Sequence, residues 1–179
     1  MDALNATEYY SYCPHCGSSN LKKSSDKSCR CYDCHHEIYF NAAAAVVAVI
    51  FNDKGEVLLT RRAHDPWKGM YDLPGGFVDP DESLETALKR ELKEELDIDI
   101  DTFQYITSDY NKYPYSNVMI HTTDALFSCH LTEKLSASIS VHDDVSEIIW
   151  FKPSDIPTTE IPGLSIRHFA EMIKEGKIG

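Results

Sequence analysis

Three glutamates in the middle of the chain have the spacing of a metal-binding helix. Glu91, Glu94 and Glu95 are three and four positions apart, so an α-helix over this stretch places their carboxylates on one face. Carboxylates that close repel one another unless a cation lies among them, and oxygen ligands suit Mg²⁺ or Mn²⁺. The plain alternative is a solvated acidic helix face, and the pattern of the surrounding residues argues against it.

The surrounding residues extend the three glutamates into a longer pattern, Gly-x5-Glu-x7-Arg-Glu-aliphatic-x-Glu-Glu followed by an aliphatic residue. The positions that satisfy it are Gly76, Glu82, Arg90, Glu91, Leu92, Glu94, Glu95 and Ile98. Through this box the chain resembles the Nudix hydrolase family. One position departs, because Asp97 stands where the family has a glycine after the glutamate pair. Asp tolerates left-handed backbone better than most residues, so we expect Asp97 to serve the same turn.

The resemblance implies a fold, a cofactor and roles for several residues. The implied fold is α/β (α+β), the Nudix α/β/α sandwich with a mixed sheet between helices. A catalytic divalent cation, Mg²⁺ or Mn²⁺, would be held by the three box glutamates and the Gly76 carbonyl, while Glu82 and Arg90 would orient the loop and the carboxylates. Many family members add an acid from a late loop, and the candidates here are Asp143, Asp144 and Glu147.

The box is also predicted to be a well-formed helix on its own residues. Asp81 and Ser83 are N-cap candidates, and an apolar stripe can bury one face while the glutamates stay on another. The stripe consists of Leu84, Ala87, Leu88, Leu92 and Leu96. Before the helix, residues 73–77 are predicted to form a strand that runs into a tight glycine turn.

Four cysteines near the N-terminus have the spacing of a zinc site. Cys13 and Cys16 form one C-x2-C pair and Cys31 and Cys34 another, with fourteen residues between the pairs. Two such pairs are typical of a tetrahedral four-cysteine Zn²⁺ site, which has no open coordination position and is therefore structural. Disulfides and a redox C-x-x-C are weaker alternatives, because no secretory signal precedes the pairs and redox chemistry needs only one of them.

Length and composition limit the domain count and the location. The 179 residues, with 42% hydrophobic and 11% aromatic residues, suit one sizeable globular domain and a small appendage. We expect residues 1–40 to form a loose tail (1–8) and the zinc ribbon, and residues 41–179 the Nudix hydrolase domain. No apolar run approaches the roughly 18 residues of a membrane span, and no signal peptide is evident, so we expect a cytoplasmic protein.

The charge limits the partners. The net charge is −12, and residues 76–98 alone carry eight acids against three bases. Residues 1–40 carry four Lys and Arg against five Asp and Glu, which is no basic footprint for nucleic acid. We therefore expect a small-molecule nucleotide substrate bridged to the acidic site by metal ions, and neither nucleic acid nor a membrane as partner. The sequence leaves a homodimer open as the oligomeric state.

Further strands and a last helix are predicted from the hydrophobic pattern. A hairpin turn is expected at residues 52–55 and an amphipathic helix at Ser165–Glu175. The predicted strands are Glu37–Phe40, Val46–Phe51, Glu56–Arg61, Thr102–Ser108, Asn117–His130 and Ile148–Phe151. Strands mixed with one central and one terminal helix indicate an α/β or α+β fold.

Candidate substrate-binding residues lie outside the box helix. Arg61 and Arg62 end a predicted strand, where a guanidinium could clamp phosphate, and Phe77 follows the glycine turn. In an expected loop at residues 108–116, Tyr113 and Tyr115 could stack on an adenine or flavin ring or simply pack on their own domain. This loop is a degenerate match to the S-Q-P-W-P-F-P-x-S pattern of NADH pyrophosphatases, a group with a zinc ribbon ahead of the Nudix domain.

The expected reaction is metal-dependent hydrolysis of the pyrophosphate bond in a nucleoside diphosphate linked to a moiety X, as in NADH, FAD or ADP-ribose. The products would be a nucleoside monophosphate and a phosphorylated X, with Glu94 or a late-loop acid as the base. One alternative is a pyrophosphohydrolase of nucleoside triphosphates or modified nucleotides. Another is a non-catalytic protein of this fold that senses nucleotides or associates with RNA through its ribbon.

Overall fold

The computed structural model describes residues 4–142 and 144–178 and divides the chain into two compact units. One unit comprises residues 1–43 and 112–121, and the other comprises residues 44–111 and 122–179. None of the described helices is long and apolar enough to cross a membrane. The expected boundary between residues 40 and 41 stays a prediction.

The first unit is built on a small antiparallel sheet. Its strands are β2 (Leu21–Ser25), β3 (Ser28–Cys31) and β4 (Glu37–Tyr39), in that order. The N-terminal tail, expected to be loose, is ordered where it is described. A short strand β1 (Leu4–Asn5) pairs in parallel with residues 118 and 119, and a single helical turn α1 (Ala6–Tyr9) follows it. Residues 1–3 of that tail lie outside the described part of the chain.

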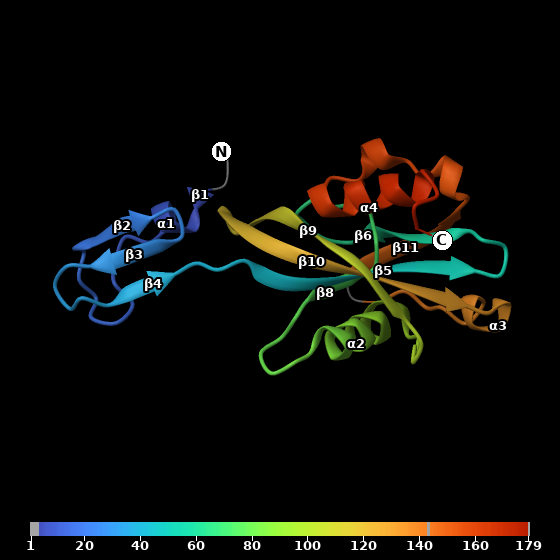
Figure 1. Ribbon diagram of the computed structural model, residues 1–179, viewed down its shortest axis with the longest axis horizontal. Coiled ribbons are helices and arrows are strands. Elements are labelled where there is room, and N and C mark those ends of the chain that lie inside the picture. The colour runs from blue at the N-terminus through green and yellow to red at the C-terminus, as the bar shows by residue number, and fades with distance from the viewer. Residues whose placement is uncertain (1–3, 143, 179) are drawn as a thin grey trace. The chain divides into compact units, whose positions relative to one another are not determined.

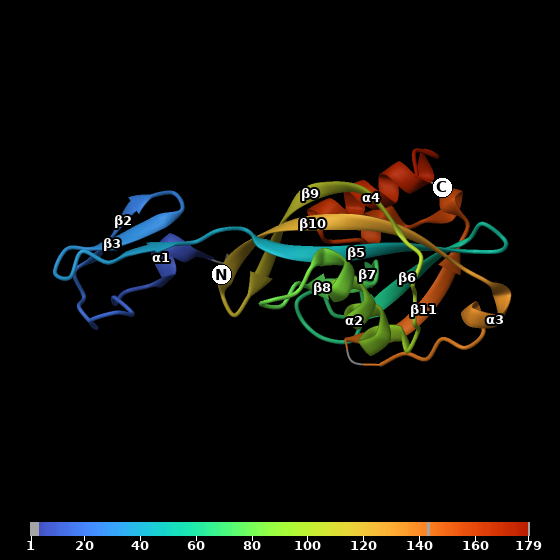
Figure 2. The ribbon, with the colours of Figure 1, turned by 60° about the horizontal axis from the view of Figure 1, so that its bottom comes forward.

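The second unit is a sheet with helices on both faces. In its central path β10 (Val118–Leu131) neighbours β5 (Ala43–Asn52), then come β6 (Val57–Arg62) and β11 (Val145–Phe151). The short strands β7 (Tyr71–Asp72) and β8 (Gly75–Phe77) pair with β6 and β5, and β9 (Gln104–Tyr115) pairs with β10. Figures 1 and 2 show helices α2 (Leu84–Leu96) and α4 (Leu164–Lys174) on opposite faces of this sheet. The remaining helical segments are α3 (Glu133–Ser136), η1 (Pro153–Asp155) and η2 (Thr158–Glu160).

Alternation along the strands produces two cores, one under each helix. Val46, Ala48 and Ile50 of β5 pack with the apolar stripe of α2, whereas Val47 and Val49 pack with α4. Successive side chains of a strand point to opposite faces, so one strand serves both layers. The predicted stripe of α2 is confirmed, with Ala87, Leu88, Leu92 and Leu96 fully buried. This burial fixes the rotation of the helix and therefore the direction of its glutamates.

Both ends of α2 have identifiable caps. Ser83 is the N-cap, and its hydroxyl accepts a hydrogen bond from the Thr86 N–H at 3.2 Å. Asp81, the other candidate, is not the cap and lies in the turn before it with φ 69°. At the C-terminal end Asp97 has φ 53° and ψ 34°, the left-handed conformation expected of the family's glycine, and its N–H bonds back to the Lys93 carbonyl at 3.1 Å.

The tyrosine segment after the box is a strand and not the expected loop. Strand β9 continues to Tyr115, and the chain reverses at Ser116 and Asn117, whose φ angles are 48° and 65°. Two successive positive φ angles are the geometry of a tight two-residue hairpin turn, in which Asn is favoured. Most residues of this strand are exposed or half-buried, and Asn111 is buried.

Asp97 allows a matched test of the helix end, because Asp97→Gly and Asp97→Ala both remove its 2.7 Å ion pair with Lys93. Only alanine must then be forced into left-handed backbone, at a cost of about 1–2 kcal/mol. We expect Asp97→Ala to have a lower free energy of unfolding than Asp97→Gly by about that amount in denaturant titrations. Equal stabilities would mean that the helix end relaxes to another conformation.

Candidate functional site

Two glycines in the strand before α2 lie very close to their neighbours. Gly75 has φ 141°, and a Cβ there would lie 2.1 Å from the Val46 carbonyl oxygen. A Cβ at Gly76 would lie 2.5 Å from the carboxylate of Glu91. Gly75 therefore lets β8 pair closely with β5, and Gly76 leaves room for the carboxylate of Glu91.

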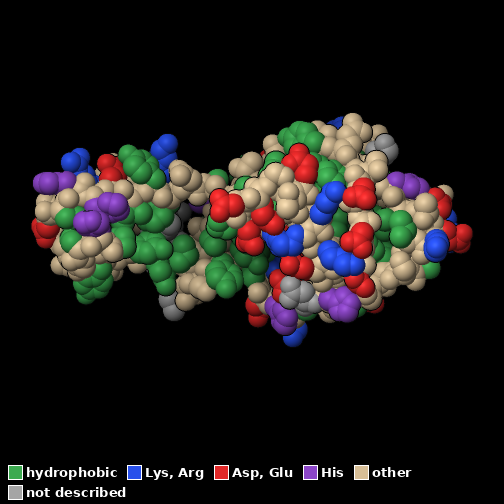
Figure 3. All heavy atoms as spheres, turned by 90° about the horizontal axis from the view of Figure 1, so that it is seen from below, with side chains coloured by type: hydrophobic (Ala, Val, Ile, Leu, Met, Phe, Trp, Pro, Cys, Tyr) green, Lys and Arg blue, Asp and Glu red, His purple; other side chains and the backbone are tan. Residues whose placement is uncertain are grey.

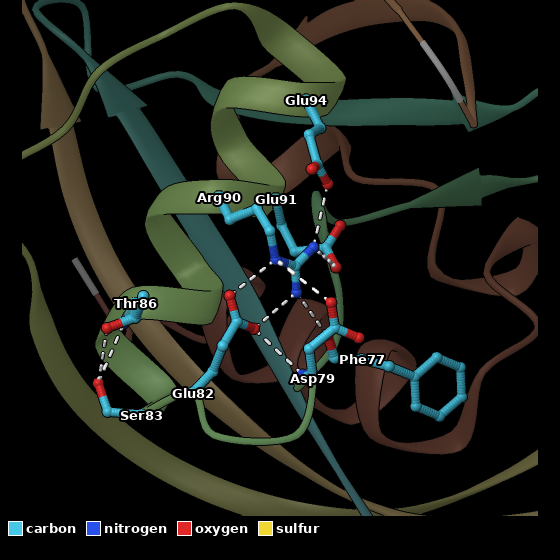
Figure 4. Close-up of polar contacts among 8 residues, drawn as sticks. All are labelled: Phe77, Asp79, Glu82, Ser83, Thr86, Arg90, Glu91 and Glu94. Atoms are coloured by element: carbon cyan, nitrogen blue, oxygen red, sulfur yellow. Dashed lines mark hydrogen bonds and ion pairs between the residues drawn. The ribbon is translucent and has the colours of Figure 1, made fainter.

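Arg90 organises the acidic side chains of the box (Figure 4). Its Nε and Nη2 donate to the two carboxylate oxygens of Glu82, both at 2.9 Å, a bidentate pair. Its Nη1 donates to Glu91 Oε1 at 2.8 Å and to Glu94 Oε2 at 3.0 Å. Its Nη2 also donates to the Phe77 carbonyl at 3.0 Å, so one guanidinium joins the loop, the strand and the helix.

Arg90 and Glu82 stabilise each other's charged forms. The hydrogen bonds from Arg90 lower the pKa of Glu82, and the bonds to Glu82, Glu91 and Glu94 raise the pKa of Arg90. The Glu82 carboxylate also accepts a bond from the Asp79 N–H at 3.1 Å, which closes the loop before the helix. Figure 3, which views the face that carries α2, shows acidic and basic side chains interleaved there.

Glu95 has a different environment from the other box glutamates. It is 7% exposed, and its Oε2 accepts a hydrogen bond from the Gly75 N–H at 3.0 Å. Burial raises its pKa well above the ordinary value, with further repulsion from Glu91, Asp72 and Asp144. The sequence spacing did not predict this anchor, because Gly75 is twenty positions away and is brought near only by the pairing of β8.

The box fits a hard divalent cation by its donors. Carboxylate oxygens of Glu91, Glu94 and Glu95 and the main chain of Gly76 are the ligand types that Mg²⁺ and Mn²⁺ take. The side chain of Glu91 occupies the space beside Gly76 that a Cβ would fill. In the described residues, however, these carboxylates do not converge as closely as the four cysteines do, because Arg90 draws Glu91 and Glu94 while Gly75 holds Glu95. Their role as ligands stays a prediction.

The segment that carries the late acids is fastened to the end of α2. The N–H groups of Ser140 and His142 donate to the carbonyls of Leu96 and Glu95 at 3.2 and 2.9 Å. Asp144 lies near enough to Glu95 to raise its pKa. Glu147 lies on β11 and is ion-paired with Arg61, with Arg61 Nε to Glu147 Oε2 at 3.0 Å. Asp143 lies outside the described residues.

Both candidate phosphate-binding arginines hold protein groups instead of standing free. Arg61 donates to the Gly69 carbonyl at 2.5 Å and to the Tyr71 hydroxyl at 2.6 Å, in addition to Glu147. Arg62 donates to the Pro66 carbonyl at 2.8 Å and to Asp72 Oδ2 at 2.9 Å. The two side chains thus fasten the loop of residues 63–70, a role that sequence reasoning missed. Phosphate binding by either of them stays a prediction.

The aromatic candidates fall in different units. Phe77 is 38% exposed, and its own carbonyl is bonded to Arg90, so it is adjacent to the acidic cluster (Figure 4). Tyr113 and Tyr115 belong to the other unit, where their rings stack on each other with centroids 6.4 Å apart. Their self-stacking accords with the packing alternative, and a role in substrate binding stays a prediction.

The four ribbon cysteines converge as a metal site requires. The Sγ atoms of Cys13, Cys16, Cys31 and Cys34 all lie within 4.8 Å of one another. Sγ–Sγ distances of 3.7 Å, between Cys13 and Cys34 and between Cys16 and Cys31, are far too long for disulfides. They match the edge of about 3.8 Å that Zn–S bonds of about 2.3 Å give a tetrahedron. The set therefore fits Zn²⁺, and the two cysteines outside it, Cys29 and Cys129, are buried free thiols.

Comparison with known proteins supports the resemblance to the Nudix family. The model of the NUDIX domain matches residues 41–169. The NAD-capped RNA hydrolase NudC of Photorhabdus laumondii subsp. laumondii is 32% identical over 124 residues, covering 68% of this chain and 48% of that protein. The protein of the same name from Escherichia coli O1:K1 / APEC is 26% identical over 172 residues, covering 94% of this chain and 63% of its own length.

Solved structures agree on the fold. The MutT protein from Methanosarcina mazei Go1 superposes with a TM-score of 0.60 at 26% identity, covering 79% of this chain and 99% of that one. The NUDIX domain of Shewanella oneidensis NrtR, complexed with ADP ribose, gives a TM-score of 0.58 at 24% identity, covering 76% and 87%. The predicted Nudix α/β fold with a mixed sheet is thereby confirmed. The chain spans about half the length of the curated relatives it matches. With its domain model, its box and its fold in agreement, the chain belongs to the Nudix family.

Proposed function

We propose that this protein hydrolyses the pyrophosphate bond of a nucleoside diphosphate linked to another moiety, of the NAD type. The observation that carries the proposal is the box itself, in which Glu91 and Glu94 share the guanidinium of Arg90 while Glu95 is buried against Gly75. A salt-bridged structural helix would have no need of a buried carboxylate bonded to the N–H of a glycine that has no room for a side chain. The names of the relatives, NAD-capped RNA hydrolases, support the substrate class.

The residues of the box divide the work of binding and orientation. Glu91, Glu94 and Glu95, with the Gly76 carbonyl, would hold Mg²⁺ or Mn²⁺, which when bound neutralises phosphate charge and acidifies water. Glu82 and Arg90 fix the loop and the carboxylate directions. Glu94, the more exposed glutamate, or an acid of the 143–147 segment would accept the proton of the attacking water.

The substrate is to be identified with a panel assayed in Mg²⁺ and in Mn²⁺. The panel comprises NADH, NAD-capped RNA, FAD, ADP-ribose, diadenosine polyphosphates and nucleoside triphosphates. Preferred release of a nucleoside monophosphate from a dinucleotide supports the proposal. Preference for nucleoside triphosphates would replace it with the alternative enzyme class, and binding without hydrolysis of any member would replace it with a sensing protein.

Residues 1–40 are proposed to be an N-terminal tail and a structural zinc ribbon, ahead of a hydrolase domain of residues 41–179. The convergence of the four cysteines supports the metal, and the family match over residues 41–169 supports the division. A small nucleotide is the proposed partner. The cytoplasmic location and a homodimeric state stay predictions.

The box glutamates give the decisive test of catalysis. Glu94→Gln and Glu95→Gln each remove one anionic ligand, so kcat should fall by roughly two orders of magnitude or more. The free energy of unfolding without metal should be level or higher in Glu95→Gln, because glutamine can still accept from Gly75 and buries no charge. Glu85→Gln, on an exposed position of the same helix, is the control and should retain wild-type turnover. Near wild-type rates in both variants would exclude the catalytic role of the box.

Phe77 and Tyr115 give a matched pair for substrate stacking. Loss of an aromatic contact with a base costs about 1–3 kcal/mol, so Phe77→Ala should raise KM roughly 5- to 150-fold. Tyr115→Ala should leave KM unchanged if its ring only stacks on Tyr113. Steady-state kinetics on the best substrate of the panel measures both. A raised KM in Tyr115→Ala with an unchanged KM in Phe77→Ala would assign base stacking to Tyr115 in the β9–β10 hairpin.

The zinc site predicts one Zn²⁺ per chain in protein purified without chelator. Elemental analysis should find it in the wild type, and Cys31→Ser should lose it and expose the ribbon to proteolysis, because a closed thiolate site contributes folding energy. Cys129→Ser, in the other unit, is the control and should keep the metal. Zinc-free wild-type protein with an intact ribbon would contradict the assignment.

A further inference from the structure

Two half-buried charged side chains lie outside the set of residues that the proposed reaction uses. Arg62 at the end of β6 and Asp72 on β7 form an ion pair at 2.9 Å, with side-chain exposures of 16% and 19%. An ion pair at this depth gains little stability over an apolar pair, so its presence calls for another explanation. The contacts on either side of the pair provide one.

Asp72 begins the short turn that ends at the Glu95 anchor. Its Oδ2 receives the Arg62 bond, while its Oδ1 accepts from the Leu73 N–H at 2.9 Å. Its carbonyl accepts from the Thr60 hydroxyl at 3.2 Å. Three residues later the Gly75 N–H donates to Glu95. Hydrogen bonds therefore fix both ends of the segment of residues 72–75, with Arg62 on Asp72 at one end and Glu95 on Gly75 at the other, and the backbone of Leu73 and Pro74 joins them.

Arg62 also fixes the other end of the preceding loop. Its Nε donates to the Pro66 carbonyl, and its main chain exchanges hydrogen bonds with Met70 and Gly69 at 3.0 and 2.9 Å. The Nε and Nη1 of the side chain are thus directed at protein acceptors on two sides. A phosphate clamp would need those donors directed at the substrate.

The charges of Arg62, Asp72 and Glu95 also link these three residues. Burial raises the pKa of Asp72, the charge of Arg62 opposes that rise, and the charge of Asp72 in turn raises the pKa of Glu95. Asp72 is therefore close enough for its charge to act on Glu95, and its ion pair with Arg62 favours the ionised form of Asp72 against the effect of burial. If Arg62 were lost, the turn would lose its anchor and Glu95 would face an unbalanced carboxylate.

We propose that Arg62 is a positioning residue, which acts through Asp72 and the 72–75 turn to hold Glu95 in the direction that cation binding requires. This inference rests on the proposed function only in treating Glu95 as a ligand of the divalent cation. It makes Arg62 and Asp72 one functional unit, in contrast to a role of Arg62 in binding substrate phosphate.

The test compares Arg62→Met and Asp72→Asn in the full chain, with Mn²⁺ alone as the probe and free Mn²⁺ measured by electron paramagnetic resonance. Charge by itself would give the two variants opposite effects, because losing a cation near the site tightens Mn²⁺ binding and losing an anion weakens it. Positioning gives them the same sign, and we expect both to weaken Mn²⁺ binding by about 10- to 100-fold. The double variant should be no weaker than either single one, because the two residues act together.

Kinetics on the same variants separates positioning from substrate binding. Positioning predicts that kcat falls while KM stays within about twofold of wild type, since the lost contact serves the cation and not the phosphate. A rise in KM with unchanged kcat and Mn²⁺ affinity would assign Arg62 to the phosphate. Opposite signs in the Mn²⁺ titrations, with a near wild-type double variant, would leave only a charge effect and would also overturn the proposal.

Controls guard against damage to the fold and against failure of the proposed reaction. Arg167→Met removes an arginine that donates to the carbonyls of Ile161 and Pro162, and it should leave Mn²⁺ binding unchanged. If Arg62→Met does not fold, Arg62→Lys keeps the charge without the two-sided fork and should show an intermediate loss of affinity. If the wild type hydrolyses nothing in the panel, the proposed function fails, while the Mn²⁺ titrations still decide the positioning role.

Discussion

The positive charge of Arg90 lies among carboxylates that would otherwise repel one another, and the arrangement of the box depends on it. Glu82, Glu91 and Glu94 each receive at least one of its hydrogen bonds, and the Phe77 carbonyl receives another. One guanidinium therefore joins the turn before the helix, the strand β8 and two turns of the helix itself. A guanidinium does not lose its proton in proteins, so this positive charge is present whenever the carboxylates around it are ionised.

Two glycines make this arrangement compatible with a packed sheet. Gly75 permits β8 to approach β5 at a distance that a Cβ would prevent, and Gly76 leaves space for the Glu91 carboxylate. The same closeness leaves Glu95 nearly without solvent and gives it the Gly75 N–H as a partner. The box thus holds one carboxylate with a raised pKa beside two that are balanced by arginine, and this difference arises from burial and not from residue type.

The ribbon follows a different principle, because its sheet has little apolar surface to bury. Among residues 7–43, the described part that precedes the second unit, the buried apolar side chains are Cys13, Cys29 and Cys31. A segment of that size with so small a core needs a cross-link or a metal to fold. The four converging thiols, of which Cys13 and Cys31 are buried, supply the ligands for such a metal.

The sequence by itself determined the features that depend on local periodicity and spacing. The helix of residues 84–96, its apolar stripe, the Asp97 turn and the pairing of the cysteine knuckles all follow from residues near one another in the chain. The tertiary structure decided what depends on distant partners. Strand pairing brought Gly75 to Glu95, made a strand of the tyrosine segment and directed Arg61 and Arg62 at protein groups. The reason is that hydrogen bonds and burial are set by neighbours in space. The residues next to Arg62 in the chain do not indicate that its partner is Asp72, ten positions away.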